Sequence, residues 1–230
     1  MVRQLPLGIR LADAARLDNF VAGPNAEAVA AVRSLVDSPA PASLLLAGAP
    51  GSGRTHLLQA ACRHAGEAGL ATAYLPLEMA GGRIAEALAG LEALELVVLD
   101  DIDVLAGKAA GERALFNLFN ELRAAGGRLL ASASDRPERL GFRLPDLVSR
   151  LNWGLFYALR PLDDAARMQV LKRRAAERGL ELGDEVCGYL LKRCPRDLPA
   201  LMALLERIDR DSLARQRRIT IPFLRETLRL

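Results

Sequence analysis

One segment near the start of the chain has the residue types and the spacing needed to hold a phosphate group. Residues 48–55 read Gly-Ala-Pro-Gly-Ser-Gly-Arg-Thr, which matches G-x-x-x-x-G-[K/R]-T. The segment follows a short apolar run and opens into a helical pattern of apolar residues, so backbone N–H groups and a helix dipole point at an anion. Its glycines allow the loop to curl around phosphate oxygens at positive φ. The pattern predicts a nucleotide-binding P-loop, with contacts from Gly48, Pro50, Gly51, Ser52, Gly53, Arg54, Thr55 and His56.

Arg54 stands at the position where a P-loop normally carries lysine. A guanidinium can fork onto phosphate oxygens, but its reach and geometry differ from those of an ammonium group. The sequence therefore predicts nucleotide binding together with weak or no hydrolysis by the chain alone. Both ADP and ATP stay open as the resident ligand, and ADP is favoured if the arginine clamps a diphosphate well.

A second candidate lies at the end of a later apolar run, where two carboxylates follow one another. Residues 94–99 are almost wholly apolar and lead into Asp100 and Asp101. Behind a P-loop, the first carboxylate is expected to hold Mg²⁺ together with the hydroxyl of Thr55, and the second to orient a water molecule. The alternative is a strand-end carboxylate that caps a turn.

The elements that must position these residues alternate along the first two-thirds of the chain. Five apolar runs are separated by helical patterns, which predicts an α/β fold with a parallel five-stranded sheet between helices. The predicted strands are 43–47, 70–75, 94–99, 128–133 and 155–159. One predicted helix, 25–36, precedes the first strand, and the main ones between later strands are 112–125 and a short one that begins at Pro145.

From Asp163 onward only helical patterns appear, at about 163–178, 184–193, 197–213 and after Thr220. We therefore expect three parts: a flexible tail at 1–10, an α/β nucleotide-binding domain at 11–160, and a small all-helical lid at 161–230.

Composition narrows the class of protein. The chain is 51% hydrophobic and 26% charged, as in soluble globular proteins, with a net charge of +3. It has no apolar run near the ~20 residues that a membrane span needs and no signal-peptide pattern, so we expect a cytoplasmic protein without a membrane partner. The basic excess falls after residue 160, and we interpret it as a solvated helical surface rather than a nucleic-acid site. Cys62, Cys187 and Cys194 have no metal-ligand spacing, which favours inert thiols.

Taken together, these motifs resemble AAA+ ATPases of the bacterial replication-initiator group, and within it the regulatory inactivators of DnaA (the Hda family). Residues 51–58 are similar to the P-loop of that family, which also carries arginine in place of lysine. Residues 140–155 resemble its box VII region, and residues 217–223 resemble its terminus. The resemblance covers nearly all 230 residues.

The resemblance implies roles for several residues. Asp100 matches the Walker B magnesium ligand, Asp101 the neighbouring acid, and Asp135 the sensor I residue, whose alternative interpretation is a turn before Pro137. Arg196 matches sensor II, a lid arginine that folds back on the nucleotide, although surface arginines are common.

Arg150 matches the arginine finger of box VII, which points away from the chain's own P-loop toward a neighbouring subunit's nucleotide. A finger supplied in this way stabilises charge that develops on the transferring phosphoryl group. A surface salt bridge is the alternative role, and Arg143 is a weaker candidate for the finger.

The first residues resemble the peptide by which these regulators bind the sliding clamp (the β subunit) of the replicative polymerase. An extended tail can place Leu5, Leu7 and Ile9 in an apolar groove while Gln4 bonds at its rim. The family pattern has Pro-Leu where this chain has Gly8-Ile9, and a disordered tail without a partner is the alternative.

The function implied is negative regulation of chromosomal replication initiation, by promoting hydrolysis of DnaA-bound ATP. The expected partners are DnaA and the clamp on DNA, with self-association possible. The chain ends at Leu230 without a helix-turn-helix pattern after the lid, so sequence-specific DNA binding is not expected. Two alternatives share the P-loop: an autonomous AAA+ ATPase of helicase-loader type acting on DNA, and a nucleotide-gated adaptor that links DnaA-like proteins to the clamp.

Overall fold

The computed structural model describes residues 15–38, 42–195, 197–215 and 218–228. They form two compact units, one made of residues up to Phe20 with Asn25–Arg160, the other of Val21–Pro24 with the chain from Pro161 onward. Four residues that precede the first helix therefore belong to the second unit. The methyl group of Ala166 and the side chain of Leu162, both in that unit, lie against Gly23.

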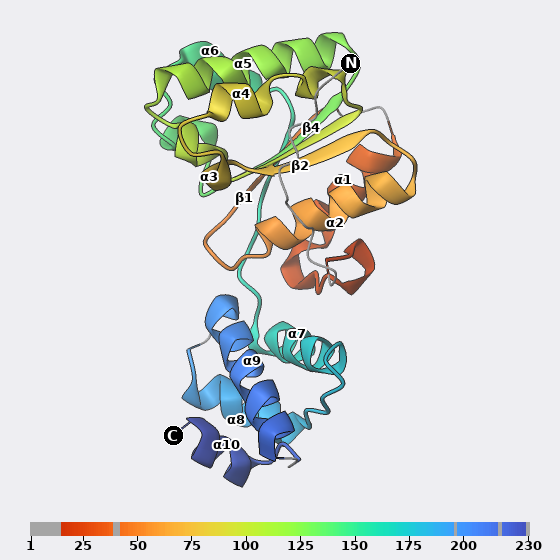
Figure 1. Ribbon diagram of the computed structural model, residues 1–230, viewed down its shortest axis with the longest axis vertical. Helices are drawn as coiled ribbons and strands as arrows, with labels where there is room; N and C mark the ends of the chain where they lie inside the picture. Colours follow the sequence, from red (N-terminus) through yellow and green to blue (C-terminus); the bar gives the residue numbers. More distant parts are fainter. Residues whose placement is uncertain (1–14, 39–41, 196, 216–217, 229–230) are drawn as a thin grey trace. The chain divides into compact units, whose positions relative to one another are not determined.

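The first unit is built on a five-stranded parallel sheet, as the sequence predicts (Figure 1). The strand order is β2-β3-β4-β1-β5. The strands are β1 (Ser43–Ala47), β2 (Thr72–Pro76), β3 (Leu96–Asp100), β4 (Arg128–Ala133) and β5 (Leu155–Ala158). Strands β2 and β3 begin two residues later than their apolar runs. The backbone N–H of Leu70 instead bonds to Ala65 O at the end of a helix, and that of Leu94 closes a turn on Leu91 O.

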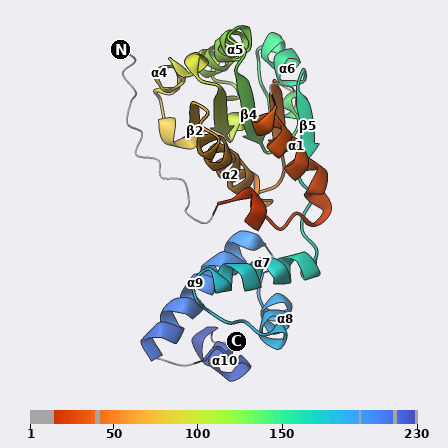
Figure 2. The same ribbon diagram turned by 90° about the vertical axis from the view of Figure 1, so that its right-hand side faces the viewer.

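Helices cover both faces of this sheet (Figures 1 and 2). Helices α1 (Ala26–Asp37) and α2 (Arg54–Glu67) pack on one face, and α3 (Leu77–Ala80), α4 (Ile84–Leu88), α5 (Ala109–Ala124) and α6 (Pro145–Leu151) on the other. Helices α3 and α4 were not predicted from the sequence, because helices of four and five residues are too short to show a 3.6-residue periodicity. Strand β3 is buried along its whole length, as expected for a strand covered on both faces.

A buried arginine ties α1 to the sheet. Arg128, the first residue of β4, is 8% exposed. Its Nη1 donates to the carbonyl oxygens of Leu35 (3.1 Å), Val36 (2.6 Å) and Ser38 (3.3 Å), at the C-terminal end of α1. A cation there satisfies carbonyl groups that have no partner within the helix, and it complements the helix dipole.

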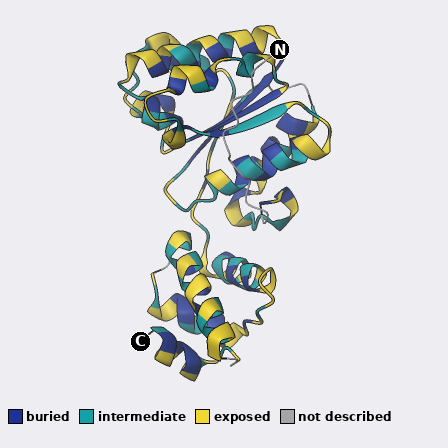
Figure 3. Ribbon diagram, in the orientation of Figure 1, coloured by how far each residue is buried: buried dark blue, intermediate teal, exposed yellow. Residues whose placement is uncertain are grey.

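The second unit is all-helical in its described residues, with α7 (Asp164–Ala176), α8 (Asp184–Arg193), α9 (Leu198–Arg215) and α10 (Ile221–Leu228). Its apolar core includes Leu190, Leu205 and Phe223, and the outward faces of the helices are exposed (Figure 3). The carboxylate of Asp163 caps α7 by accepting from the N–H of Ala166. No helix in the described parts of either unit is long and apolar enough to span a bilayer.

Burial of the three thiols agrees with an inert role. Cys62 and Cys187 are buried, Cys194 is half-buried, and all three are free. Desolvation raises the pKa of each thiol, which suppresses the reactive thiolate.

Candidate nucleotide site and the arginine of α6

The P-loop lies where β1 ends and α2 begins, at the carboxyl edge of the sheet. Gly51 and Gly53 adopt positive φ values of 77° and 96°. A Cβ atom on Gly48 would lie 2.6 Å from Ser52 Oγ, and one on Gly53 would lie 2.8 Å from the ring of Phe20. Backbone conformation therefore favours glycine at positions 51 and 53, and close packing favours it at positions 48 and 53.

Several polar groups in this loop have no partner within the protein, as expected of a site for an anion. Ser52 Oγ and Arg54 Nη1 are buried and make no hydrogen bond in the described structure. The first N–H groups of α2 also lack partners within the helix, and exposed Thr55 lies in that first turn. The residues present fit a phosphate group.

Asp100 ends β3 and is 3% exposed. Its Oδ1 accepts a hydrogen bond from Ser132 Oγ (2.5 Å), on β4, and its Oδ2 accepts one from Tyr74 Oη (2.8 Å), on β2. A carboxylate offers about four lone-pair sites, so these two bonds leave room for a metal ion. The donor set suits Mg²⁺, which prefers a carboxylate and a hydroxyl with water completing its shell.

Burial raises the pKa of Tyr74, with the neighbouring charge of Asp100 acting in the same direction. The phenol therefore keeps its proton at neutral pH and remains a donor to Asp100. Neither Tyr74 nor Ser132 was predicted from the sequence. A signal was present for Ser132, because it is a hydroxyl residue within the predicted strand 128–133.

Asp101 lies directly opposite the unusual P-loop arginine. Its Oδ1 is 3.0 Å from Arg54 Nη2, in an ion pair whose atoms are not aligned as a hydrogen bond. Among the described non-glycine residues, only Asp101 has a positive φ, 56°. Burial raises the pKa of this carboxyl, Arg54 opposes the shift, and the charge of Asp100 adds to it. Arg54 is thus the counter-ion of Asp101, the acid that follows Asp100.

Asp135 follows β4, between β3 and β1 in the sheet order, so it reaches the same carboxyl edge as the P-loop. Its Oδ1 accepts from the N–H of Arg136 (2.8 Å), and its Oδ2 lies 3.5 Å from Arg139 Nη1. The hydrogen bond from Arg136 is the main reason that the pKa of Asp135 is lowered. The carboxylate takes part in the turn before Pro137 and remains about half exposed.

The side chain of His56 does not face the phosphate site. Its Nε2 lies 3.2 Å from Arg16 O and 3.1 Å from Asn19 Oδ1, so only the backbone N–H of His56 can contact a phosphate. Arg196 lies outside the described residues, and so do the tail residues Gln4, Leu5, Leu7 and Ile9.

Arg150 lies in the last turn of α6, five residues before Leu155, where β5 starts. Because β5 is parallel to β1, its start is at the edge of the sheet opposite the P-loop, about 13 Å away along a four-residue strand. Its guanidinium carbon is 3.9 Å from the centroid of the Trp153 ring. No carboxylate of the described residues forms an ion pair with Arg150, so the structure shows a stacked arginine in place of the alternative salt bridge.

Glu112, near the start of α5, fixes the segment that leads into α6. It is 1% exposed, and its carboxylate accepts hydrogen bonds from the N–H groups of Gly107, Arg143 and Leu144. This places Arg143, the weaker finger candidate, in an anchored turn with an exposed side chain. The sequence analysis did not identify Glu112, although its position in the apolar stripe of α5, three residues before buried Leu115, was a signal.

Comparisons with known families cover most of the chain. The model of the bacterial DnaA ATPase domain matches residues 11–158, and the model of the Hda lid domain matches residues 164–228.

Solved structures of replication initiators are similar to the chain. DnaA of Aquifex aeolicus, bound to AMPPCP, is 26% identical with a TM-score of 0.74, over 90% of this chain and 71% of that one. A DnaA bound to AMPPCP and single-stranded DNA is 27% identical with a TM-score of 0.75, over 90% and 69%. Domain III of Thermotoga maritima DnaA has a TM-score of 0.85, over 96% and 98%, and at 24% identity the likeness concerns the fold.

Proposed function

This chain belongs to the DnaA-related AAA+ ATPases and carries an Hda-type lid, and from that premise we propose that it is a negative regulator of chromosomal replication initiation. In this role it holds its own nucleotide with little turnover, binds the polymerase sliding clamp on DNA, and promotes hydrolysis of the ATP bound to DnaA. Arg150 acts as the finger supplied in trans.

The placement of Arg150 carries the proposal. The chain's own phosphate cradle and this arginine lie at opposite edges of one sheet, too far apart for the side chain to serve its own nucleotide. The guanidinium also has no carboxylate partner in the described residues, so its positive charge is available to an outside anion. An unneutralised arginine at the edge distant from the P-loop suits a nucleotide held by a neighbour.

The candidate site supports slow turnover of the chain's own nucleotide. The loop N–H groups, Ser52 and Arg54 would hold the phosphates of ADP or ATP, Thr55 and Asp100 would hold Mg²⁺, and Arg196 would reach the nucleotide from the lid. The bound Mg²⁺ would neutralise phosphate charge. Since Arg54 is paired with Asp101, the acid that would orient a water molecule is engaged by the chain's own P-loop. The AMPPCP-bound DnaA structures support a nucleotide of the adenosine class.

The proposed role implies two partners, DnaA and the sliding clamp. DnaA supplies the ATP that Arg150 would reach. If the chain self-associates, Arg150 would lie near the P-loop of a second copy instead. The clamp would bind Gln4, Leu5, Leu7 and Ile9 as an extended peptide, which is the mode expected of a short apolar tail with a polar residue at its edge. Clamp binding would hold the regulator on DNA close to the initiator.

The Arg150→Ala variant tests the proposed role. The stimulated rate at which DnaA-bound ATP is hydrolysed should fall by about 10³-fold, or to the rate of DnaA alone, because trans arginine fingers contribute effects of that size. Nucleotide binding by the regulator itself should be unchanged. Arg33→Ala is a matched control, since that arginine forms an exposed ion pair on α1.

If the Arg150→Ala protein still stimulates hydrolysis of DnaA-bound ATP fully, Arg150 is not the trans arginine finger. Brisk hydrolysis by the purified wild-type chain alone, increased by single-stranded DNA, would instead favour an autonomous ATPase of helicase-loader type.

A further inference from the structure

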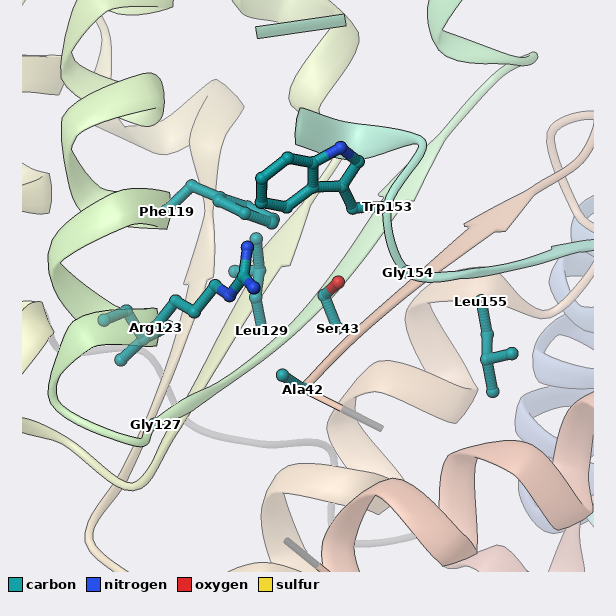
Figure 4. Close-up of a pocket in the computed structure, with 10 residues that line it drawn as sticks. Ala42, Ser43, Phe119, Arg123, Gly127, Leu129, Trp153, Gly154 and Leu155 are labelled. Carbon is teal, nitrogen blue, oxygen red and sulfur yellow. The ribbon is translucent and has the colours of Figure 1, made fainter. Parts of the chain in front are cut away.

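Trp153, the only tryptophan of the chain, binds two arginines through its ring. The guanidinium carbon of Arg150 lies 3.9 Å from the ring centroid, and that of Arg123, on α5, lies 4.4 Å from it. The indole is 55% exposed and borders a cavity of about 500 Å³. In Figure 4, Arg123 reaches from α5 toward the ring, and Phe119 lies beside it.

The backbone at Trp153 and Gly154 is held by close contacts with α6 and β1. The backbone N–H of Trp153 bonds to Arg150 O at 3.1 Å, which keeps the residue close to the last turn of α6. The next residue, Gly154, passes so close to β1 that a Cβ atom there would lie 2.4 Å from Ser43 O. Leu155 then starts β5. The backbone that carries the ring is therefore held against the sheet, and the ring lines a cavity together with residues of α5.

A cation–π contact differs from an ion pair because it leaves the N–H donors and the charge of the arginine available to an anion. The guanidinium carbon of Arg150 lies over the indole ring, and a cation–π contact of this kind does not consume the N–H donors. Neither Arg150 nor Arg123 has a carboxylate partner among the described residues, so both keep their charge. A free arginine side chain has many rotamers, and the stacking contact reduces that freedom without using the donors that bind phosphate.

We propose that Trp153 is a positioning residue for Arg150. It holds the guanidinium in one orientation, and Arg123 adds a second positive charge beside the same ring. The fork of Arg150 is thereby preorganised for the terminal phosphate of a nucleoside triphosphate held by another AAA+ protein. This inference rests on the function proposed above and adds the residue that prepares the finger.

The first test compares Trp153→Leu and Trp153→Phe with the wild-type chain in stimulating hydrolysis of DnaA-bound ATP. Leucine keeps an apolar side chain but removes the ring, so the rate at saturating regulator should fall by about twofold to fivefold, the range for an exposed cation–π contact. Phenylalanine should restore most of that rate. The regulator concentration for half-maximal stimulation should change little.

An unchanged saturating rate for Trp153→Leu, or a change confined to the half-saturating concentration, would overturn the positioning role. Equal loss in the leucine and phenylalanine variants would overturn it as well. If Trp153→Leu fails to fold, as judged by circular dichroism, the Trp153→Phe variant and the tryptophan fluorescence of Arg150→Leu still test whether the ring positions Arg150.

The second test uses the chain alone. Because Trp153 is the only tryptophan, intrinsic fluorescence reports on this ring. Replacing the stacked cation in Arg150→Leu should shift the emission and increase quenching by acrylamide, whereas Arg33→Leu should do neither. Identical spectra for wild type and Arg150→Leu would show that the ring does not hold Arg150.

The two proposals fail in distinguishable ways. If Arg150→Ala leaves stimulation intact, the trans finger is wrong whatever Trp153 does. If Arg150→Ala abolishes stimulation and Trp153→Leu behaves as wild type, only the positioning inference is wrong.

Discussion

Arg54 and Arg150 differ in what surrounds their charge. Arg54 is 11% exposed and is held against Asp101, with one of its nitrogens buried and unpartnered. Arg150 stacks on an exposed indole and has no carboxylate in contact in the described structure. The first arrangement suits a group that binds a resident anion, and the second suits a group that meets an anion from outside.

Replacing Arg54 with alanine should weaken nucleotide binding about tenfold to a hundredfold, because charge-assisted hydrogen bonds to phosphate contribute about 1.5–3 kcal/mol. Arg54→Lys should bind more tightly than Arg54→Ala, since it keeps the charge but loses the fork. Isothermal titration with ADP and with ATP measures both constants, and Arg33→Ala serves as the control. An ADP affinity that survives Arg54→Ala would remove this arginine from the site.

The candidate residues of the site could be named from the sequence, whereas their partners in the structure could not. The P-loop, Asp100 and Arg150 occur in recognisable local patterns. Tyr74 and Ser132 meet Asp100 only because β2 and β4 flank β3, an adjacency set by the sheet order rather than by sequence spacing. The contact between Arg123 and Trp153 likewise joins α5 to the segment before β5.

At the scale of elements, alternating apolar runs and helical periodicity predicted the strands, the long helices and their order. The first residues of β2 and β3 were predicted less well, because Leu70 and Leu94, which fit a strand pattern, close the preceding turns. Two short helices, α3 and α4, were not predicted, since their form depends on packing against α5 and the sheet. Local pattern therefore determined which elements exist, and tertiary contacts determined their limits.

Arg128 offers a test of how α1 is held. Arg128→Met should lower the free energy of unfolding by about 2–3 kcal/mol, because it leaves buried carbonyl groups of Leu35 and Val36 without their donor. Urea denaturation followed by circular dichroism measures the change. Arg33→Met, at an exposed ion pair, should stay within about 0.5 kcal/mol of wild type. A loss no larger than that of the control would mean that α1 does not depend on this contact.

At the scale of the whole molecule, the sheet separates the two candidate sites. Its carboxyl edge carries the P-loop, Asp100 and Asp101, and its opposite edge carries Arg150 and Trp153. A protein built in this way can keep a nucleotide at one edge while offering a cation to a neighbour at the other. Parallel strands make the separation unavoidable, since β1 ends where the P-loop begins and β5 starts just after the arginine.

The most direct measurement follows phosphate release from DnaA preloaded with γ-labelled ATP, on DNA that carries the sliding clamp, while this chain is loaded only with ADP. Since the label is on the nucleotide of DnaA, the result identifies whose ATP is consumed. We expect faster release when the chain is added, a smaller effect when the clamp is omitted, and no effect with Arg150→Ala. Release that stays at the rate of DnaA alone would contradict the role proposed for Arg150.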